Sequence, residues 1–322
     1  MSLRPDRPLA IYYEHPDWFR PLFAELERRG TPYERLHADT HRYDPADPAP
    51  PYALLFNRMS PSAWLRGRGD AVFYTLQYLA HLERLGVRVV NGYRAFVVET
   101  SKALQLSLFE RLGLQHPRAR VIHRLAQAPA AADGLRFPIV VKPNIGGSGA
   151  GIRRFDTLTA LTAAAARDDG TGALGIDQTG LVQEFIPSAD GTIVRVEVLG
   201  GRFLYGIRIH TPGDTFNLCP ADVCQTVDGV ELVRAACPAD APRTGLTVEC
   251  YTPPPSIVAQ VERIMAAAGV EVGGVEYLTD ARDGRLYFYD VNALSNFVAD
   301  GPRVVGFDPF ERLADWLEQE AA

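Results

Sequence analysis

The first 90 residues alternate two patterns of apolar positions. Short runs of β-branched and aromatic residues predict buried strands, and apolar residues that recur every three or four positions predict helices. We expect strands at residues 9–13, 31–36, 52–56 and 87–91, and helices at residues 17–29 and 72–85. Because strand and helix alternate, this part of the chain should form a small α/β layer with a parallel sheet.

The rest of the chain predicts further helices and strands, several of the strands in antiparallel pairs. Thr100 or Ser101 can cap a helix that carries Leu104 on its apolar face. Later strands should pair as antiparallel hairpins, one of them around Gly200-Gly201. Further strands are predicted at 120–123, 139–141, 192–199, 202–209, 275–279 and 286–291, and helices at 158–166, at 256–268 and from Pro309, after its cap Asp308.

The stretch FPIVVKPNIGGSGAGI, residues 137–152, joins a predicted buried strand to a glycine-rich loop. The strand delivers Lys142, and the loop contains Gly146, Gly147, Ser148, Gly149 and Gly151. Glycines let main-chain N–H groups approach an anion closely, so the stretch suggests a triphosphate clamp with Lys142 as its cation. Ile152 replaces the last glycine of a dinucleotide fingerprint, and the lysine precedes the glycines, unlike in a Walker loop. A plain glycine-rich hairpin is the alternative.

Glu276, Asp290 and Asn292 form a second group of interest. Asp290 and Asn292 are two positions apart on one predicted strand, so their side chains face the same side. If the partner strand brings Glu276 alongside, the two carboxylates would repel each other unless a cation lies between them. Such hard oxygen ligands suit Mg²⁺ bound to nucleotide phosphates. The alternative is a hairpin with polar residues on its exposed face.

Three basic side chains are further candidates for ligand contact. Lys102 falls in the first turn of its predicted helix, where the helix dipole disfavours a cation unless a phosphate lies nearby. His15 and Arg58 follow predicted strands at the carboxyl edge of the parallel sheet, where ligands bind in such folds. Each of the three also fits an ordinary exposed side chain.

Composition narrows the class of protein. The chain has 322 residues, of which 47% are hydrophobic and 22% charged, so a globular protein of two or three domains is expected. Its net charge of -6 argues against a nucleic-acid-binding surface. The sequence contains no CxxC pair, so its cysteines predict neither a zinc ribbon nor a disulfide framework. The N-terminus lacks a signal-peptide apolar segment and no apolar run approaches a membrane span, so we expect a cytoplasmic protein without a membrane partner.

The candidate residues stand in a characteristic order along the chain. These are Lys102, Lys142 with its glycine loop, Gln183, Glu184, Phe185 and Ile186, then Arg195, and finally Glu276, Asp290 and Asn292. The order resembles the ATP-grasp ligases, in particular the branch that holds glutathione synthetase and the ribosomal-protein glutamate ligases, over roughly residues 95–300. The resemblance implies an α/β and α+β architecture in three parts. They are a pre-ATP-grasp domain at 1–94, a central subdomain with the glycine-rich lid at 95–186, and a C-terminal subdomain with the metal site at 187–322.

The resemblance also implies roles for individual residues. Lys102, Lys142 and Arg195 would contact ATP, and the loop from Gly146 to Gly151 would close over its phosphates. The backbone of residues 183–186 would hold adenine, with Glu184 at the adenine amino group. Asp190 or Glu197 would contact the ribose or a lysine. Mg²⁺ or Mn²⁺ would be bound by Glu276, Asp290 and Asn292. An acyl phosphate would be stabilised by Arg208 and Asn217.

The implied activity is ATP-dependent ligation of a small-molecule carboxylate to an amine, such as an amino acid or a peptide. It would proceed through an acyl phosphate and release ADP and phosphate. The alternatives are a phosphotransferase of the same fold and a non-catalytic nucleotide-binding module. Residues 218–222 depart from the family's more glycine-rich stretch, so the substrates stay open, as does assembly into a homo-oligomer. His15, Arg58, Arg303 and residues 217–225 are expected to line the substrate pocket.

Overall fold

The computed structural model describes residues 6–15, 17–147, 149–167, 174–210, 226–227, 230–231 and 247–322. Within these residues the strands form two four-stranded sheets, one five-stranded sheet and one two-stranded sheet of β11 (Thr226–Val227) and β12 (Val230–Glu231). No helix in this part of the chain is both long enough and apolar enough to cross a membrane.

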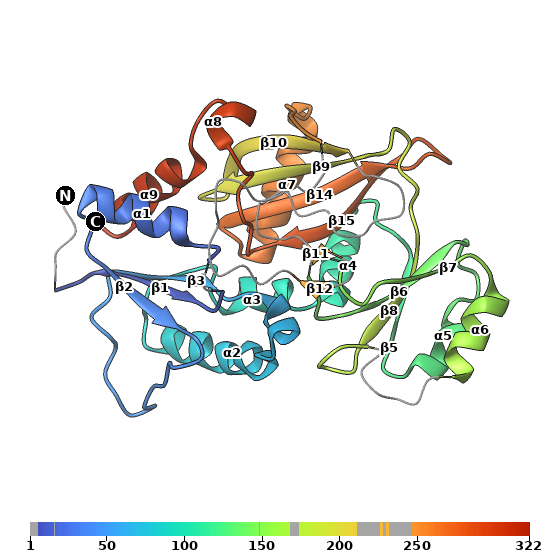
Figure 1. The fold of residues 1–322 in the computed structure, drawn as a ribbon, viewed down its shortest axis with the longest axis horizontal. Coiled ribbons are helices and arrows are strands. Elements are labelled where there is room, and N and C mark those ends of the chain that lie inside the picture. The colour runs from blue at the N-terminus through green and yellow to red at the C-terminus, as the bar shows by residue number, and fades with distance from the viewer. Residues whose placement is uncertain are drawn as a thin grey trace.

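The N-terminal sheet is parallel, as predicted, with the order β2-β1-β3-β4. Its strands are β1 (Leu9–Tyr13), β2 (Tyr33–His37), β3 (Leu54–Arg58) and β4 (Val89–Val90). Helix α2 (Gly69–Arg84) covers one face of the sheet, and α1 (Arg20–Arg29) covers the other together with α9 (Pro309–Glu320) from the far end of the chain (Figure 1). The turn after β3 contains a short 3₁₀-helix, Pro61–Arg66, which faces the cavity described below.

Two helices then connect the sheets. Helix α3 (Tyr93–Glu99) was not expected from the sequence. Helix α4 (Lys102–Arg111) begins, as predicted, after Ser101, whose Oγ accepts a hydrogen bond from Leu104 N at 3.2 Å. The prediction that Leu104 lies on the buried face is wrong, because its side chain is 44% exposed. Gln105 is buried instead, since it bonds to the backbone of Val291 on the sheet beneath the helix.

The second four-stranded sheet is antiparallel with the order β5-β8-β6-β7. It consists of β5 (Ala119–Ile122), β6 (Ile139–Pro143), β7 (Arg153–Phe155) and β8 (Gly180–Glu184). The short helix α5 (Ala128–Ala131) and α6 (Leu158–Ala166) cover one face with a small apolar core. The opposite face of this sheet lines the cavity described below.

The five-stranded sheet is antiparallel and has the order β13-β10-β9-β14-β15. Its strands are β9 (Thr192–Leu199), β10 (Arg202–His210), β13 (Val248–Cys250), β14 (Val272–Thr279) and β15 (Leu286–Asn292). Helix α7 (Pro255–Ala268) packs on one face, and the opposite face meets the N-terminal layer and the segment that holds α8 (Gly301–Val304). Both predicted hairpins are confirmed.

The apolar cores run across the predicted domain borders. Phe109 of α4 packs against Phe288 of β15, with ring centroids 6.2 Å apart, so α4 belongs to the core of the five-stranded sheet. Leu9 of β1 shares another core with Ile207 of β10 and Leu313 of α9. The division at residues 94 and 186 therefore stays a prediction.

Candidate active site

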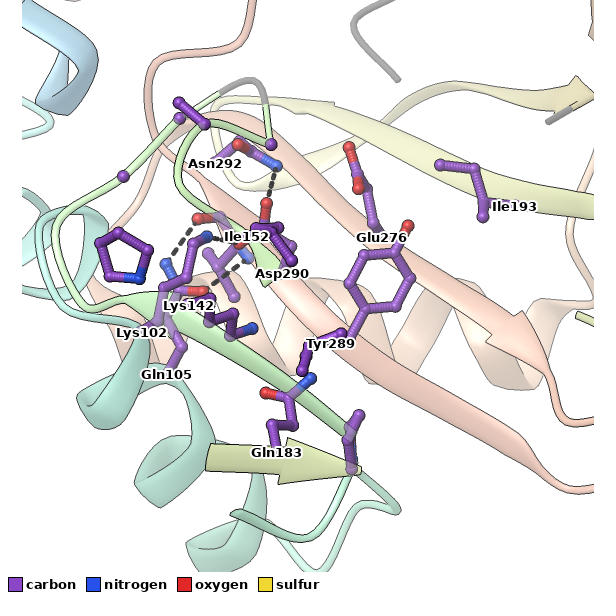
Figure 2. Close-up of a pocket in the computed structure, with 18 of the residues that line it drawn as sticks. Lys102, Gln105, Lys142, Ile152, Gln183, Ile193, Glu276, Tyr289, Asp290 and Asn292 are labelled. Carbon is purple, nitrogen blue, oxygen red and sulfur yellow. Dashed lines mark hydrogen bonds and ion pairs between the residues drawn. The ribbon is translucent and has the colours of Figure 1, made fainter. Parts of the chain in front are cut away.

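A cavity of about 650 Å³ lies between the antiparallel four-stranded sheet and the five-stranded sheet. Side chains of α4, β6, β8, β14 and β15 converge on it (Figure 2). The predicted residues that line it are Lys102, Lys142, Gly146, Gly147, Gly149, Gln183, Glu184, Phe185, Ile186, Arg195, Glu276, Asp290 and Asn292. Residues that are up to 190 positions apart in the sequence thus meet in one place.

Strand register aligns the polar residues of the five-stranded sheet. Arg195 of β9 lies opposite Glu276 of β14, which lies opposite Asp290 of β15. Side chains of directly opposite residues share a face of the sheet, so these three form a row across the cavity floor. A neighbouring row consists of Glu197, Gly274 and Asn292. A Cβ at Gly274 would come within 3.0 Å of the Glu197 carboxylate, so glycine leaves room for that side chain.

The Arg195 guanidinium is bonded to two side chains of its own sheet and to one that follows β15. Its guanidinium donates to Glu197 Oε1 at 2.6 Å, to Glu276 Oε1 at 3.1 Å and to Ser295 Oγ at 2.7 Å. The two carboxylates outweigh the effect of burial and raise the Arg195 pKa. Arg195 therefore orients Glu276, and a direct contact between Arg195 and ATP stays a prediction.

Two lysines, one from α4 and one from β6, lie beside each other near the carboxylates. Lys102 Nζ lies 2.6 Å from Asp290 Oδ1, and Lys142 is buried at 6% exposure (Figure 2). Burial and, to a smaller extent, the charge of Lys102 together lower the Lys142 pKa to about 7, against a smaller opposing effect of Asp290. Because a buried cation beside a second cation is unfavourable, this part of the cavity favours a multiply charged anion.

Glu276, Asp290 and Asn292 do converge, as the sequence predicts. Burial raises the Glu276 pKa, and the negative charge of Asp290 adds to the effect, while Arg195 opposes it. Asn292 Nδ2 donates to Asp290 Oδ2 at 3.3 Å. Among the described residues no cluster of three or more His, Cys, Asp or Glu side chains is suited to a metal. Two carboxylates and one amide fit Mg²⁺, which usually binds through one or two carboxylates and completes its shell with phosphates and water.

The strand predicted to hold adenine presents a different side chain from the one expected. Gln183 faces the cavity, and its Oε1 is buried without a hydrogen-bond partner in the described part of the chain (Figure 2). The Glu184 carboxylate accepts from Arg136 N at 2.9 Å and lies 3.7 Å from the Arg118 guanidinium. Successive strand residues face opposite sides, so Gln183 and Glu184 point to different faces of the sheet, and an adenine contact at this strand stays a prediction.

The glycine loop has the backbone that its sequence requires. Gly149 and Gly151 both have φ of 73°, which disfavours residues with a side chain. Gly151 lies outside the cavity lining, and a Cβ there would come within 2.8 Å of Pro143 Cγ. Gly147 lies against Ser62 of the N-terminal layer. Ser148 lies outside the described residues.

The structure corrects the placement of Arg208, which was expected in the active site. Arg208 is opposite Val194 on β9 and opposite Glu249 on β13, whereas Arg195 is opposite Ile207. It therefore points to the face away from the cavity, where it bonds to Glu249 at 3.2 Å and covers the Tyr251 ring. A shift of one residue along a strand reverses the face.

Asp190 and Glu197, which were expected at the ribose or a lysine, are both bonded to other protein groups. Asp190 Oδ1 accepts from Thr192 N at 3.0 Å and from Ser188 Oγ at 3.1 Å, so its carboxylate closes a turn outside the cavity lining. Glu197 bonds to Arg195 as described above. Asn217 and the segment 217–225 lie outside the described residues.

The predicted substrate residues occupy three different environments. Arg58 is buried, not solvated: its Nη2 donates to Ser295 O at 2.6 Å, and its guanidinium lies 5.0 Å from the Phe19 ring centroid. His15 stacks on Trp18 at 4.1 Å, and of these two rings Trp18 lines the cavity. Arg303 is 68% exposed and pairs with Asp300, so its expected place in the pocket is wrong.

Two residues that shape the site, Glu99 and Gln105, were not expected from the sequence. Glu99, at the end of α3, lines the cavity and accepts a hydrogen bond from Ala293 N. Burial, with the Asp290 charge, raises the Glu99 pKa to about 7. Gln105 exchanges hydrogen bonds with both backbone groups of Val291, which lies between Asp290 and Asn292. No local motif marks either residue, because their roles depend on pairing between distant segments.

Known proteins share this fold and part of this sequence. No protein-family model matches the chain. A probable alpha-L-glutamate ligase of Sodalis glossinidius is 30% identical over 217 residues, which cover 60% of this chain and 70% of that protein. A D-alanine–D-alanine ligase of Ectopseudomonas mendocina is 32% identical over 122 residues, and the match spans only 36% of that protein.

Among solved structures, the ATP-grasp ligase PsnB complexed with a minimal precursor has the same fold. It superposes with a TM-score of 0.67 and 17% identity over 98% of this chain and 99% of PsnB. The glutamate-ligase match covers more than two thirds of its relative at 30% identity, and the shared fold agrees with it. The chain therefore belongs to the ATP-grasp ligases, in the branch that includes the alpha-L-glutamate ligases.

Proposed function

We propose that the protein is an ATP-dependent ligase that joins a carboxylate to an amine through an acyl phosphate and releases ADP and phosphate. One observation carries the proposal: the buried Lys142 lies beside Lys102 in the same cavity as Glu276 and Asp290. Two cations facing two carboxylates suit a nucleotide triphosphate with its divalent cation. The names of the ligase relatives agree with this chemistry.

In the proposed complex, ATP lies between the two antiparallel sheets. Lys102 and Lys142 bind its phosphates, and the glycine loop closes over them. Gln183 offers its buried Oε1 to the amino group of adenine. Glu276, Asp290 and Asn292 would hold Mg²⁺, which supplies positive charge to the phosphate oxygens; Mn²⁺ accepts the same ligands. Because ATP is the substrate, we expect the enzyme to act in the cytoplasm.

The reaction then has two steps. A carboxylate oxygen of the first substrate attacks the γ-phosphorus of ATP, the bond to the β-phosphate oxygen breaks, and ADP leaves. The amine of the second substrate next attacks the acyl carbon, loses a proton and expels phosphate, which leaves an amide. The ammonium groups of Lys102 and Lys142 stabilise negative charge on the transferring group. Walls of buried side chains limit hydrolysis of the acyl phosphate by water.

The substrates would bind at the end of the cavity that meets the N-terminal layer. Trp18, Ser60, Ser62, Leu294 and Asn296 line that end. Asn296 Oδ1 and Trp18 Nε1 are both buried without a hydrogen-bond partner in the described residues, so each can bond to a polar substrate group. We propose small carboxylates and amines of amino acids or peptides as the substrate class.

Release of ADP that depends on substrates tests the function. Amino acids and dipeptides are supplied in pairs with ATP and Mg²⁺, and ADP, AMP and phosphate are quantified. We expect ADP and phosphate in equal amounts only when a suitable carboxylate and amine are both present. AMP with pyrophosphate contradicts the proposal. A stable phosphorylated product without an amine would indicate a phosphotransferase, and nucleotide binding without any turnover would indicate a binding module.

The adenine contact gives a separate prediction. Gln183→Leu keeps the size of the side chain and removes the acceptor, so ATP affinity should fall about 5- to 10-fold, as for loss of one hydrogen bond. GTP presents a carbonyl at the corresponding position of its base, so its affinity should change less. Titration with both nucleotides measures the difference. An equal effect on ATP and GTP would place Gln183 away from the adenine amino group.

A further inference from the structure

Asn144 joins three segments around the proposed phosphate site. It follows β6 directly, two positions after Lys142, and is buried at 7% exposure. Its Oδ1 accepts from Ala103 N at 3.0 Å and from Ser101 Oγ at 3.2 Å, and its Nδ2 donates to Asp177 Oδ2 at 2.8 Å. Its side chain therefore connects the start of α4 to the turn before β8.

The backbone of Asn144 strengthens the same connection. Lys102 N donates to Asn144 O at 3.3 Å, and Asn144 N donates to Thr179 O at 2.9 Å. The N–H groups in the first turn of a helix have no partner within the helix. Here Asn144 satisfies those of Lys102 and Ala103, and Ser101 satisfies that of Leu104. These three N–H groups are therefore already bonded, and the group that the start of α4 offers to a ligand in the cavity is the ammonium group of Lys102.

These bonds fix two like charges relative to each other. Lys102 is held to Asn144 by its own backbone, and Lys142 is separated from Asn144 by the single residue Pro143. The charges on the two lysines repel. Without a rigid link, α4 and β6 would move apart to relieve this repulsion, and a phosphate chain would then meet the two cations one at a time.

The first turn of α4 is also bonded to the five-stranded sheet. Lys102 bonds to Asp290, and Gln105 bonds to Val291, so the helix is fastened to β15 beside the carboxylates. Asn144 fastens the same helix to β6 and to the base of the glycine loop, which starts two residues later. Movement of α4 at Asn144 would therefore change the position of Lys102 with respect to both lid and carboxylates.

We propose that Asn144 is a positioning residue for nucleotide binding, because its bonds to residues 101–103 and to Asp177 hold Lys102 and Lys142 at the spacing that the ATP phosphates require. The inference rests on the proposed ATP-binding function. It assigns to Asn144 no contact with ATP itself. The affinity for ATP should therefore depend on the bond between Asn144 and Asp177, and exchanging these two side chains with each other should preserve that affinity.

The exchange is the test. Asn144→Asp places a carboxylate against that of Asp177, and Asp177→Asn places two amide NH₂ groups against each other. The double variant restores one donor and one acceptor with the roles reversed, and Thr179 N, now bonded to Asp177 Oδ1 at 3.2 Å, can still bond to the new amide oxygen. The net charge of the double variant equals that of the wild type.

The readout is the dissociation constant of a non-hydrolysable ATP analogue with Mg²⁺, measured by calorimetry beside the melting temperature of the free protein. We expect Asn144→Asp to weaken binding about tenfold or more, Asp177→Asn to weaken it less, and the double variant to return to within about threefold of the wild type. The matched control is Asn57→Asp, which removes another buried asparagine whose Nδ2 donates to Asn91 O at 3.0 Å. This control should lower the melting temperature and leave the dissociation constant unchanged.

Two results would overturn the inference, and they differ from failure of the proposed function. If Asn144→Asp lowers the melting temperature but binds the analogue as tightly as the wild type, its role is only structural. If the double variant binds as weakly as Asn144→Asp, the bond to Asp177 is not what positions the lysines. Wild-type protein that binds no nucleotide at all contradicts the proposed function, and the inference falls with it.

Discussion

Asp290→Asn is expected to lower substrate-dependent ADP release by about a factor of 1,000, the size of effect seen when one group that stabilises transition-state charge is lost. Asp290 lies between Lys102 and Glu276, so its carboxylate serves both the metal set and the placement of a phosphate-binding lysine. The asparagine keeps the shape of the side chain but removes the charge. Initial rates of ADP formation at saturating ATP measure the loss.

The matched control lies on the same hairpin. Asp283 is exposed in the turn, where it bonds to Arg285 N at 2.9 Å and to the Tyr287 hydroxyl at 3.0 Å, away from the cavity. Asp283→Asn should retain nearly wild-type turnover. An unchanged far-ultraviolet spectrum for both variants would show that the fold is intact. Near-normal activity of Asp290→Asn would remove Asp290 from the reaction.

Lys142→Met is expected to weaken binding of the ATP analogue about 10- to 100-fold at neutral pH, the range for hydrogen bonds to charged groups. The effect should also depend on pH. In the free protein, burial and the Lys102 charge lower the Lys142 pKa to about 7, so the side chain is largely neutral above that pH. A bound anion favours the ammonium form and raises the pKa, so binding takes up a proton.

The sign of the pH dependence follows from this uptake. Wild-type affinity should fall as the pH rises from about 7 to 9, because the free protein must gain a proton to bind. Calorimetry in buffers of different ionisation enthalpy measures the protons taken up. Lys142→Met should take up fewer protons, and Lys142→Arg, which stays charged throughout this range, should show a flatter profile. A pH profile that is the same in all three proteins would place Lys142 away from the phosphates.

Local patterns were sufficient for most elements of the fold. Helix α4 begins after the predicted cap Ser101, and the hairpin of β14 and β15 brings Glu276 opposite Asp290 as expected. Periodicity identifies a strand and a cap identifies a helix start without any knowledge of distant residues. The order of the motifs then indicated the family that the relatives confirm.

Direction of side chains was harder to predict. Arg208 was expected in the cavity, but strand alternation turns it to the opposite face of the sheet. Glu184 was expected at the amino group of adenine, but its carboxylate accepts a hydrogen bond from the backbone of Arg136. A shift of one residue reverses the face, and the resemblance to the family does not resolve register to that precision. Asn144 and Gln105 escaped notice because a buried amide has meaning only once its partners from other segments are known.

Transfer of a labelled oxygen tests the central claim most directly. Once the screen identifies a substrate pair, the carboxylate substrate is labelled with heavy oxygen, and the products are separated and weighed by mass spectrometry. An acyl phosphate leaves one carboxylate oxygen on the phosphorus, so we predict one labelled oxygen in the released phosphate and none in ADP. Label in AMP, or its retention in a stable phosphorylated product, would contradict the account.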